Sequence, residues 1–378
     1  MNKAEDSLHL GPRPSGPSPR ADGANSRAAA LRNARDCNES LSIITTADRD
    51  VWDDFVTSRA EANFLQSWDF YEFHKQRGCQ VVRRMVMRGD EIVGVYAGVV
   101  EAARRGRHLA IAGGPLIDWD DREVVEAVFR DIREQGKKHN CVFVRVRPQL
   151  EESEKSLALM RELGLTRAPM FLSVEYAGVL DLNKTREEIL AGASQGFRRK
   201  LRKAKKAEVE ITASDDDAAI SEFCRLEKLH AERQGYVAFS TSFLTKQFEA
   251  FRKHGEVLIY TARKDGEVLA QNFMIFYGPE ASYHYGVSSV LGTKYSAAPL
   301  LHLAAMDEAR RRGCVRYNLW GIVGTDETSH RFYGVSEFKR SFGCAELKYT
   351  PAHDLVLKPL PYKITKFIEL ARKKKRHL

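Results

Sequence analysis

One α/β unit occurs twice in this chain, and this repeat restricts the fold more than any other feature. In the first copy, two strand-like runs joined by a Gly-Asp turn occupy 80–102, and a third run at 108–118 ends in a Gly-Gly-Pro break. A segment with helical apolar spacing follows at 122–140, and an apolar strand follows at 141–148. The same order returns over 256–322. The sequence therefore predicts two copies of one hairpin, strand, helix and strand unit.

Landmark residues keep their spacing between the two copies. Gly78 and Gly255 lie 177 positions apart, and Gly136 and Gly313 have the same separation. The helix of the first copy is expected to end near Gly136. Glu91 and Glu267 lie 176 positions apart. This register favours a duplication.

The chain of 378 residues is long enough for two domains, each with its own core. Its first 40 residues are rich in Pro, Gly, Ser, Ala and Arg, a composition that predicts disorder and not a signal peptide. The predicted organisation is a disordered tail at 1–40, domains at 41–170 and 171–350, and a C-terminal segment with a basic tail at 351–378.

Positive charge is concentrated in two stretches. The net charge is +9, but residues 197–206 carry seven Lys or Arg, and residues 358–378 carry eight against Glu369. Phe197, Leu201 and Ala204 recur at helical spacing in the first stretch, which predicts a helix packed by one narrow face with its cations outward. Such clustering indicates an anionic partner, although a solvated helix face is an alternative interpretation.

The remaining composition predicts a cytosolic protein. The six cysteines are scattered without CxxC spacing, which is typical of reduced thiols and indicates neither a disulfide framework nor a zinc site. No apolar run approaches the length of a membrane span, and the eleven histidines show no paired metal spacing. We therefore expect no metal site.

The order of elements in each copy resembles the core of the Gcn5-related acetyltransferase fold. That resemblance predicts an α/β (α+β) protein with two tandem acetyltransferase-like domains. The fold normally holds the pyrophosphate of coenzyme A on a glycine-rich loop that opens a helix. The corresponding stretches here are "SSVLGTKYSAAP" and "GGPLIDWDD", which have too few glycines or the wrong charge. We therefore expect no coenzyme A and no other cofactor.

Several separated motifs resemble the FemABX (Fem-type) peptidoglycan-bridge aminoacyltransferases. They occur in the family's order between about residues 40 and 365. They are "FLQSWDFYEFHKQRG" at 64–78, "AGGP" at 112–115, "RRKLRKAKKAEVEI" at 198–211, "HAERQGYVAFS" at 230–240, "SYHYGVSS" at 282–289, "DEARRRGCVRYNLWGI" at 307–322, "GVSEFKRSFGCAELKY" at 334–349 and "PLPY" at 359–362. The resemblance implies transfer of an amino acid from aminoacyl-tRNA to the stem peptide of a lipid-linked or nucleotide-linked cell-wall precursor, without a metal or coenzyme A.

The chain departs from the family pattern twice. It has no long Glu/Lys/Leu-rich insert, so we expect no coiled-coil arm. A strand that usually ends in Asp-Phe-Gly-Gly reads "NLWGI" here, so Asn318 replaces the acid.

The resemblance also implies site residues. Lys339, in "EFKRSFG", matches the family's functionally important lysine and is the catalytic candidate, with a snorkelling surface lysine as the alternative. Lys75 and Arg233 match basic positions near the precursor diphosphate, with His74 as an alternative to Lys75 by one register. Tyr283 and Tyr285 alternate on one strand, so we expect them to share a face and bind substrate or pack in the core. The anion-binding candidates for tRNA are Arg198, Arg199, Arg202 and Lys203.

Two other functions remain open from the sequence. One is a Fem-like N-acyltransferase that modifies another amine, such as that of a polysaccharide sugar, with a donor other than tRNA. The other is a catalytically silent nucleic-acid-binding module, which the absence of aromatic residues among the cations of 198–206 disfavours, and we expect no DNA partner. The basic tail is expected either to contact the inner face of the membrane peripherally, to grip tRNA or to be solvated.

Overall fold

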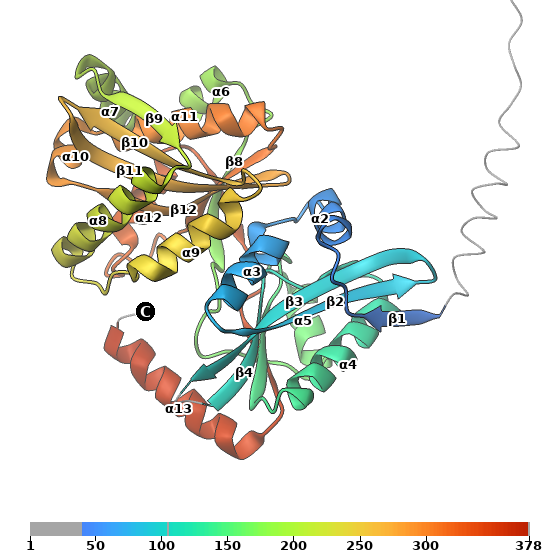
Figure 1. The fold of residues 1–378 in the computed structure, drawn as a ribbon. Helices are drawn as coiled ribbons and strands as arrows, with labels where there is room; N and C mark the ends of the chain where they lie inside the picture. Colours follow the sequence, from blue (N-terminus) through green and yellow to red (C-terminus); the bar gives the residue numbers. More distant parts are fainter. Residues whose placement is uncertain (1–39, 104–105, 377–378) are drawn as a thin grey trace, which may run out of the picture. The chain divides into compact units, whose positions relative to one another are not determined.

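The computed structural model describes residues 40–103 and 106–376. The predicted disordered tail at 1–40 lies, apart from Ser40, outside the described residues. The described chain forms two mixed sheets with helices packed on them (Figure 1). This arrangement confirms the predicted fold class of two tandem acetyltransferase-like domains.

The first sheet has the strand order β1-β2-β3-β4-β6-β15-β7, with β5 paired to β3. Its strands are β1 (Leu41–Ile44), β2 (Gln80–Arg88), β3 (Glu91–Ala103), β4 (Gly106–Ala112), β5 (Leu116–Ile117), β6 (Phe143–Arg147), β7 (Thr166–Arg167) and β15 (His353–Val356). Its helices are α2 (Arg49–Ser58), η2 (Phe64–Gln66), α3 (Trp68–Gln76), α4 (Arg122–Lys138) and α5 (Glu154–Glu162).

The second sheet repeats this plan with the order β14-β8-β13-β12-β11-β10-β9. Its strands are β8 (Tyr176–Asp181), β9 (Glu210–Ser214), β10 (Val257–Lys264), β11 (Glu267–Tyr277), β12 (Glu280–Ser288), β13 (Arg316–Gly321) and β14 (Ala345–Lys348). The remaining helices are α6 (Arg186–Gly192), α7 (Gln195–Lys206), α8 (Asp217–Gln234), α9 (Thr241–Arg252), α10 (Val290–Tyr295), α11 (Ala298–Arg311), α12 (Tyr333–Arg340) and α13 (Pro359–Arg376). None of these described helices exceeds 18 residues, so the described chain contains no long coiled-coil arm, as expected.

The residues that end equivalent helices support the duplication. Gly78 and Gly255 both adopt left-handed backbone conformations after α3 and α9, with matching hydrogen bonds back to the helix. Helix α4 ends at Lys138, near Gly136 as predicted, but Gly136 itself lies inside the helix, where a Cβ atom would approach Leu357 to 2.6 Å. The true counterpart of Gly313 is Asn140, which has the same left-handed conformation two residues after α4. The two copies are therefore offset by 173 positions at this point and by 177 at the first.

The strand next to each parallel pair is distant from that pair in sequence. The two central parallel pairs, β4–β6 and β12–β13, are connected through α4 and α11 as the unit predicts. Next to β6 lies β15, which follows the whole second domain in sequence, and next to β13 lies β8, the first strand of the second domain. The return of β15 to the first sheet was not predicted. We propose domain limits of 41–170 and 171–350, as expected from the sequence. Strand β15, which follows the second of these domains, belongs to the first sheet.

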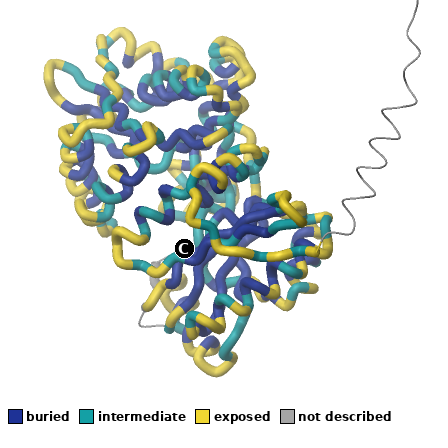
Figure 2. Tube along the Cα trace, turned by 45° about the vertical axis from the view of Figure 1, so that its right-hand side comes forward, coloured by how far each residue is buried: buried dark blue, intermediate teal, exposed yellow. Residues whose placement is uncertain are grey.

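Buried side chains follow the strands of both sheets (Figure 2). One apolar cluster lies under the hairpins of both domains and joins Trp52 and Phe64 to Phe248 and Phe273. A second cluster fills the other face of the second sheet beneath α7 and α11, and includes Phe197 and Leu301. Two of the functional candidates, Tyr283 and Tyr285, lie on β12, which borders both clusters.

Candidate functional site

The strands β12 and β13 pair over a short distance and then separate. Their parallel register runs from Glu280↔Arg316 to Ser282↔Asn318 and no further. The equivalent pair in the first domain, β4 and β6, keeps its register over its whole length, from His108↔Phe143 to Ala112↔Arg147. Beyond Ser282, β12 therefore has strand β11 on one side only, and its other edge has backbone groups that are not used in a strand pair.

A β-bulge at His284 changes the direction of the two tyrosines. Tyr285 pairs with Phe273 and Tyr283 with the next residue, Met274, so His284 is an extra residue on β12. Tyr283 consequently packs on the cluster beneath α11, whereas Tyr285 packs on the cluster that joins the domains. The prediction that both tyrosines share a face is wrong, because the bulge interrupts the alternation of the strand.

The end of β13 is also irregular. Trp320 has φ of 66°, a conformation that side chains other than glycine rarely adopt, and its register with β8 shifts between Asn318 and Gly321. The Oδ1 atom of Asn318 accepts a 2.8 Å hydrogen bond from the backbone N–H of Trp320. The residue that replaces the family's acid therefore holds this turn. The Trp320 ring stacks on Phe64 with centroids 5.2 Å apart.

Lys339 lies at this separation between β12 and β13. It belongs to α12, is only 6% exposed, and its Nζ atom donates a 2.7 Å hydrogen bond to the carbonyl oxygen of Gly321. The same nitrogen lies 5.7 Å from the ring centre of Tyr283. No described carboxylate forms an ion pair with it, and burial lowers the pKa of its ammonium group to about 7. The alternative of an exposed, snorkelling lysine is therefore wrong.

A histidine that the sequence analysis did not single out lies beside Lys339. His302, on α11, is fully buried, and its ring contacts Tyr283 edge-on with centroids 4.5 Å apart. Its Nδ1 atom lies 2.8 Å from the Tyr317 hydroxyl, while its Nε2 atom has no partner among the described residues. Burial lowers its pKa to about 3, so this ring is neutral at physiological pH. The only sequence signal was one histidine within the apolar helix "APLLHLAAMDEA".

The most specific motif, "FKRSFG", joins α12 to the basic helix α7. Phe342 packs on Phe197 of α7 with centroids 4.4 Å apart, and the backbone N–H of Ser194 donates to the carbonyl of Ser341. Gly343 has φ of 75°, and a Cβ atom there would lie 2.3 Å from the Gly192 carbonyl oxygen. Only glycine fits this crossing. The start of α7 is thus fixed against the helix that carries Lys339.

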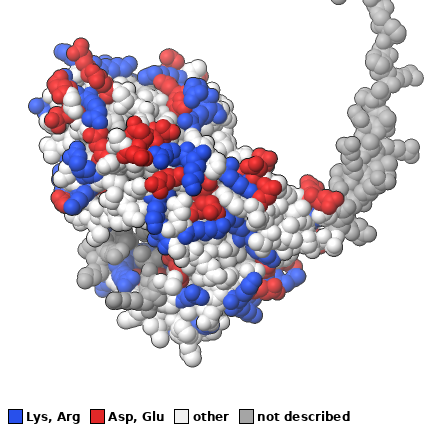
Figure 3. Space-filling view, viewed as in Figure 1, with Lys and Arg blue, Asp and Glu red and all other residues white. Residues whose placement is uncertain are grey.

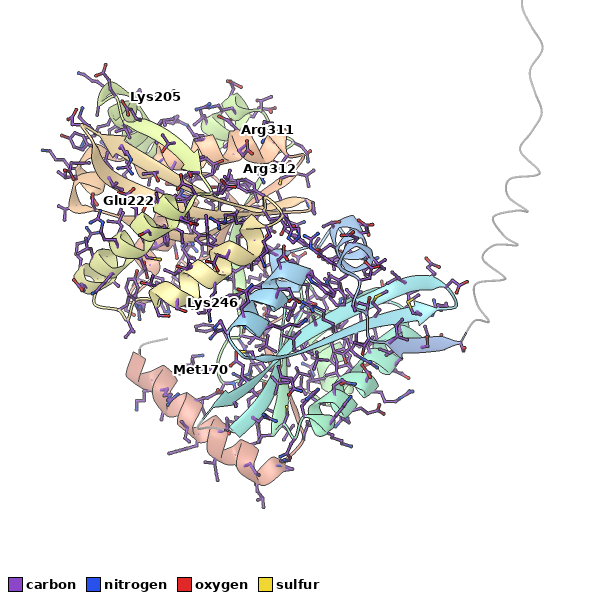
Figure 4. The ribbon with its side chains drawn as sticks, viewed as in Figure 1. Met170, Lys205, Glu222, Lys246, Arg311 and Arg312 are labelled. Atoms are coloured by element: carbon purple, nitrogen blue, oxygen red, sulfur yellow. The ribbon has the colours of Figure 1, made fainter. Side chains whose placement is uncertain are left out.

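The predicted helix at 197–206 is confirmed as α7, with Phe197, Leu201 and Ala204 buried. Arg198 differs from the other cations of this helix, because its Nη1 atom donates to three backbone carbonyls at the end of α6. Arg199, Arg202 and Lys203 are exposed, and their side chains form no hydrogen bond or ion pair with a described residue. Figure 3 shows Lys and Arg atoms at the edge of the second domain around α7, where Figure 4 labels Lys205.

The two remaining candidates lie on other helices. Arg233, near the end of α8, donates a 2.6 Å hydrogen bond to the carbonyl of Ser288 at the end of β12. Lys75, on α3, pairs with Glu72 at 2.8 Å, and its side chain is 46% exposed. Lys246 of α9, labelled in Figure 4, donates to the Gln76 carbonyl beside it. The structure brings Lys339 and Tyr283 together, whereas no contact joins Lys75 to either of them, and the alternative His74 is largely buried with a pKa lowered to about 3.

The residues before α11 do not fit the pyrophosphate of coenzyme A. Pro299 stands in the first turn and has no N–H, and the N–H of Leu300 is bonded to Ala297. The short helix α10 occupies the preceding stretch so closely that a Cβ atom on Gly292 would lie 2.0 Å from the Leu269 carbonyl. In the first domain, the first turn of α4 follows Asp121 and carries Glu123, which would repel a phosphate. Neither helix start therefore suits the pyrophosphate of coenzyme A.

In the described part of the chain, no group of three or more His, Cys, Asp or Glu residues is placed to hold a metal ion. The five described cysteines have free thiols. Over the same residues, none of the helices combines the length and the apolar character that crossing a membrane requires.

Comparison with known families identifies both halves of the chain. Residues 191–340 match the acetyltransferase (GNAT) domain family, and residues 47–159 match the FemAB family. The chain is thus similar to FemAB proteins in its first half and to GNAT domains in its second half. A lipid II:glycine glycyltransferase of Staphylococcus aureus is 22% identical over 233 residues, which are 59% of this chain and 54% of that protein. The chain thus spans about half the length of the curated relatives it matches.

Solved structures support the fold. The crystal structure of FemX superimposes with a TM-score of 0.79 at 18% identity, covering 87% of this chain and all of that one. A tandem GNAT protein from the clavulanic acid biosynthesis pathway superimposes with a TM-score of 0.54 at 13% identity, covering 84% of this chain and 98% of that one. Both likenesses concern the fold alone.

Proposed function

We propose that this protein transfers an aminoacyl group from aminoacyl-tRNA to an amine on the stem peptide of a peptidoglycan precursor. The match of residues 47–159 to the FemAB family and the relatives named lipid II:glycine glycyltransferase support this class of acceptor. The residues before α11, which do not suit coenzyme A, support a different acyl donor. The single observation that carries the proposal is the buried Lys339 amine between the separating strands β12 and β13.

The reaction needs stabilisation of negative charge at one point. The acceptor nitrogen attacks the ester carbonyl, a C–N bond forms, and the carbonyl oxygen becomes an oxyanion. The ester C–O bond then breaks, and a proton from the amine goes to the released ribose oxygen. A protonated Lys339 has no described carboxylate to neutralise it, so a developing oxyanion would be its ionic partner. In a site screened from water such a partner stabilises the transition state more than the ground state.

The free edge of β12 supplies a surface for the substrate main chain. Because β13 leaves β12 after Ser282, the segment from Tyr283 onward has backbone groups available on that side. Tyr283 and His302 border the same place as Lys339. We assign Lys339 the catalytic role and Tyr283 a substrate-binding role. Tyr285, which faces the other cluster, Arg233 and Lys75 remain proposed contacts for the acceptor.

The exposed cations of α7 fit the donor. Phe197, in the first turn of α7, packs on Phe342, which follows α12, so a tRNA acceptor arm bound along α7 would end near Lys339. Arg199, Arg202 and Lys203 have no internal partner among the described residues, which leaves their charge available for phosphates. The guanidinium group of Arg198 is hydrogen-bonded to the end of α6, so we assign Arg198 the role of positioning α7.

A transfer assay with purified components tests this proposal. The protein is incubated with a mixture of charged tRNAs and either lipid-linked or nucleotide-linked precursor, with and without ribonuclease, and the modified precursor is identified by mass spectrometry. We expect one amino acid to be added only when the tRNA is intact. Transfer that survives ribonuclease treatment would exclude tRNA as the donor. If no charged tRNA leads to a modified precursor, the peptidoglycan precursor is excluded as the acceptor.

A further inference from the structure

The C-terminal helix α13 is fixed to the first domain by a polar face. Arg145 of β6 forms two hydrogen bonds of 2.7 and 2.8 Å with the Asp354 carboxylate, and its guanidinium group also binds Glu369 of α13 at 2.8 Å. The Tyr362 hydroxyl donates to Asp354 at 2.9 Å. All four residues are buried. This charge-assisted network orients the helix on the strands β6 and β15.

The opposite side of α13 is apolar and exposed. Leu360, Ile364 and Phe367 recur at helical spacing, and their side chains are 76%, 66% and 74% exposed. Leu370 extends this row at 48%. The buried residues Tyr362, Thr365 and Glu369 occupy the other side of the helix. The usual arrangement of a surface helix is thus inverted, because its polar side is buried against the protein and its apolar row is exposed. Figure 1 shows where α13 lies in the fold.

Cations border the exposed row. Lys363 and Lys366 lie one turn before Phe367 and Leu370, and all four side chains are exposed. Arg372, Lys373 and Lys374 follow at the end of the row and are also exposed. None of these five cations forms an ion pair with a described residue.

We propose that α13 is a docking surface for an anionic lipid bilayer, with its apolar row in the acyl boundary and its cations at the headgroups. An exposed apolar row flanked by cations is the pattern of helices that lie in the plane of the interface. The aliphatic parts of the lysine and arginine side chains can lie beside the apolar row while their charged groups reach the anionic headgroups. The Arg145 network presents the row as a preformed surface, so binding needs no folding of the helix. This surface does not depend on the reaction proposed above.

The row itself favours a bilayer over RNA. An RNA duplex offers phosphates to the cations but no apolar medium for the aliphatic side chains Leu360 and Ile364. α7 presents the contrasting pattern, since its exposed side carries cations and its apolar residues are buried. The two basic stretches of the chain therefore have different partners.

Vesicle co-sedimentation of the full chain tests the proposal. The wild type is mixed with vesicles of phosphatidylglycerol and phosphatidylcholine in equal parts, or of phosphatidylcholine alone. We expect clear binding to the anionic vesicles and weak binding to the neutral ones. The double variant Ile364→Glu/Phe367→Glu should lose at least about tenfold in partition. Its matched control, Val51→Glu/Leu229→Glu, places the same charges at exposed apolar positions on α2 and α8 and should bind as the wild type does.

A second measurement reports insertion directly. In Phe367→Trp, the added tryptophan fluorescence, relative to the wild type, should shift to the blue and be quenched by brominated lipid. Absence of wild-type binding to anionic vesicles, unchanged binding of the Ile364→Glu/Phe367→Glu variant, or an added fluorescence that brominated lipid leaves unquenched in Phe367→Trp would each overturn the proposal. Binding of a short RNA duplex that is lost in the same double variant would assign the surface to RNA instead.

Discussion

The Nζ atom of Lys339 donates a 2.7 Å hydrogen bond to the carbonyl oxygen of Gly321, which joins α12 to the end of β13 through a buried amine. The amine has no ionic partner among the described residues, and burial brings its pKa to about 7 from an ordinary value of 10.5. A structural lysine would gain little from such a position, because a buried charge without a counter-charge destabilises the fold. This cost is understandable if the charge is needed during the reaction.

The first prediction is that Lys339→Met folds normally and loses transfer activity about 100-fold or more. The methionine side chain fills a similar volume and removes the desolvated charge. Because the folded protein holds the Lys339 proton less tightly than the unfolded chain, this group makes the wild type less stable as pH falls from about 10.5 toward about 7. Thermal melting should therefore show a smaller loss of stability over this range in the variant.

Lys348→Met, at an exposed position on β14, is the matched control and should keep wild-type kinetics. Lys339→Arg tests the charge state, because its guanidinium group stays protonated. We expect wild-type kcat/KM to fall above about pH 7 and this descending limb to disappear in any active Lys339→Arg protein. Full activity of a folded Lys339→Met variant would remove Lys339 from the mechanism.

The second prediction concerns the packing of Tyr283 on Gly286. A Cβ atom at position 286 would lie 1.6 Å from the Tyr283 hydroxyl oxygen and 2.4 Å from its ring. Gly286→Ala should therefore destabilise the protein by about 2 kcal/mol, since the ring must move. If the ring is the cause, Tyr283→Ala/Gly286→Ala should be no less stable than Tyr283→Ala alone in denaturant melts. Additive losses would contradict this assignment.

The sequence predicted the elements whose signals are local. The hairpin turn at Asp265-Gly266 has left-handed conformations at both residues, as its Asp-Gly pair indicates. The apolar stripe of α7 needed only helical spacing. The order of these elements, repeated twice, was sufficient for the fold class, because each unit contains one parallel pair joined by one helix.

The geometry of the candidate site could not be predicted, because it depends on features that leave no local signal in the sequence. The bulge at His284 reverses the direction of Tyr283, and no residue type in "SYHYGVSS" marks it. The burial of Lys339 results from contacts with β12 and β13, which precede it by 18 residues or more. The placement of β15 beside β6 joins segments about 200 residues apart. Such long-range packing overrides local patterns.

The third prediction concerns Glu256, which lies between the domains beside Arg49. Its carboxylate accepts a 3.2 Å hydrogen bond from Arg49, and Asp53 and Asp69 lie close enough to repel it, with His254 bonded to Asp69. Burial, and then this repulsion, raise the pKa of Glu256 to about 8. The folded protein therefore retains this proton more strongly than the unfolded chain, and the associated stability is present at low pH and lost as pH rises toward about 8.

Glu256→Gln should flatten the decline of stability between about pH 4.5 and about pH 8, as measured by denaturant melts at several pH values. Glu267→Gln, at an exposed position on β11, changes the same type of residue and should leave the wild-type profile intact. A profile of Glu256→Gln that falls as steeply as the wild type would show that another group controls it.

The fourth prediction separates the two kinds of arginine on α7. Arg199→Glu/Arg202→Glu reverses two exposed cations without internal partners among the described residues, so it should raise KM for charged tRNA about tenfold and leave kcat and thermal stability nearly unchanged. Lys137→Glu/Lys138→Glu makes the same charge change on α4 and should not alter KM. Arg198→Ala should instead lower thermal stability, because three carbonyls of the α6 terminus lose their donor. An equal rise in KM from the α4 and α7 variants would mean that tRNA responds to overall charge, and α7 would then be an ordinary solvated helix.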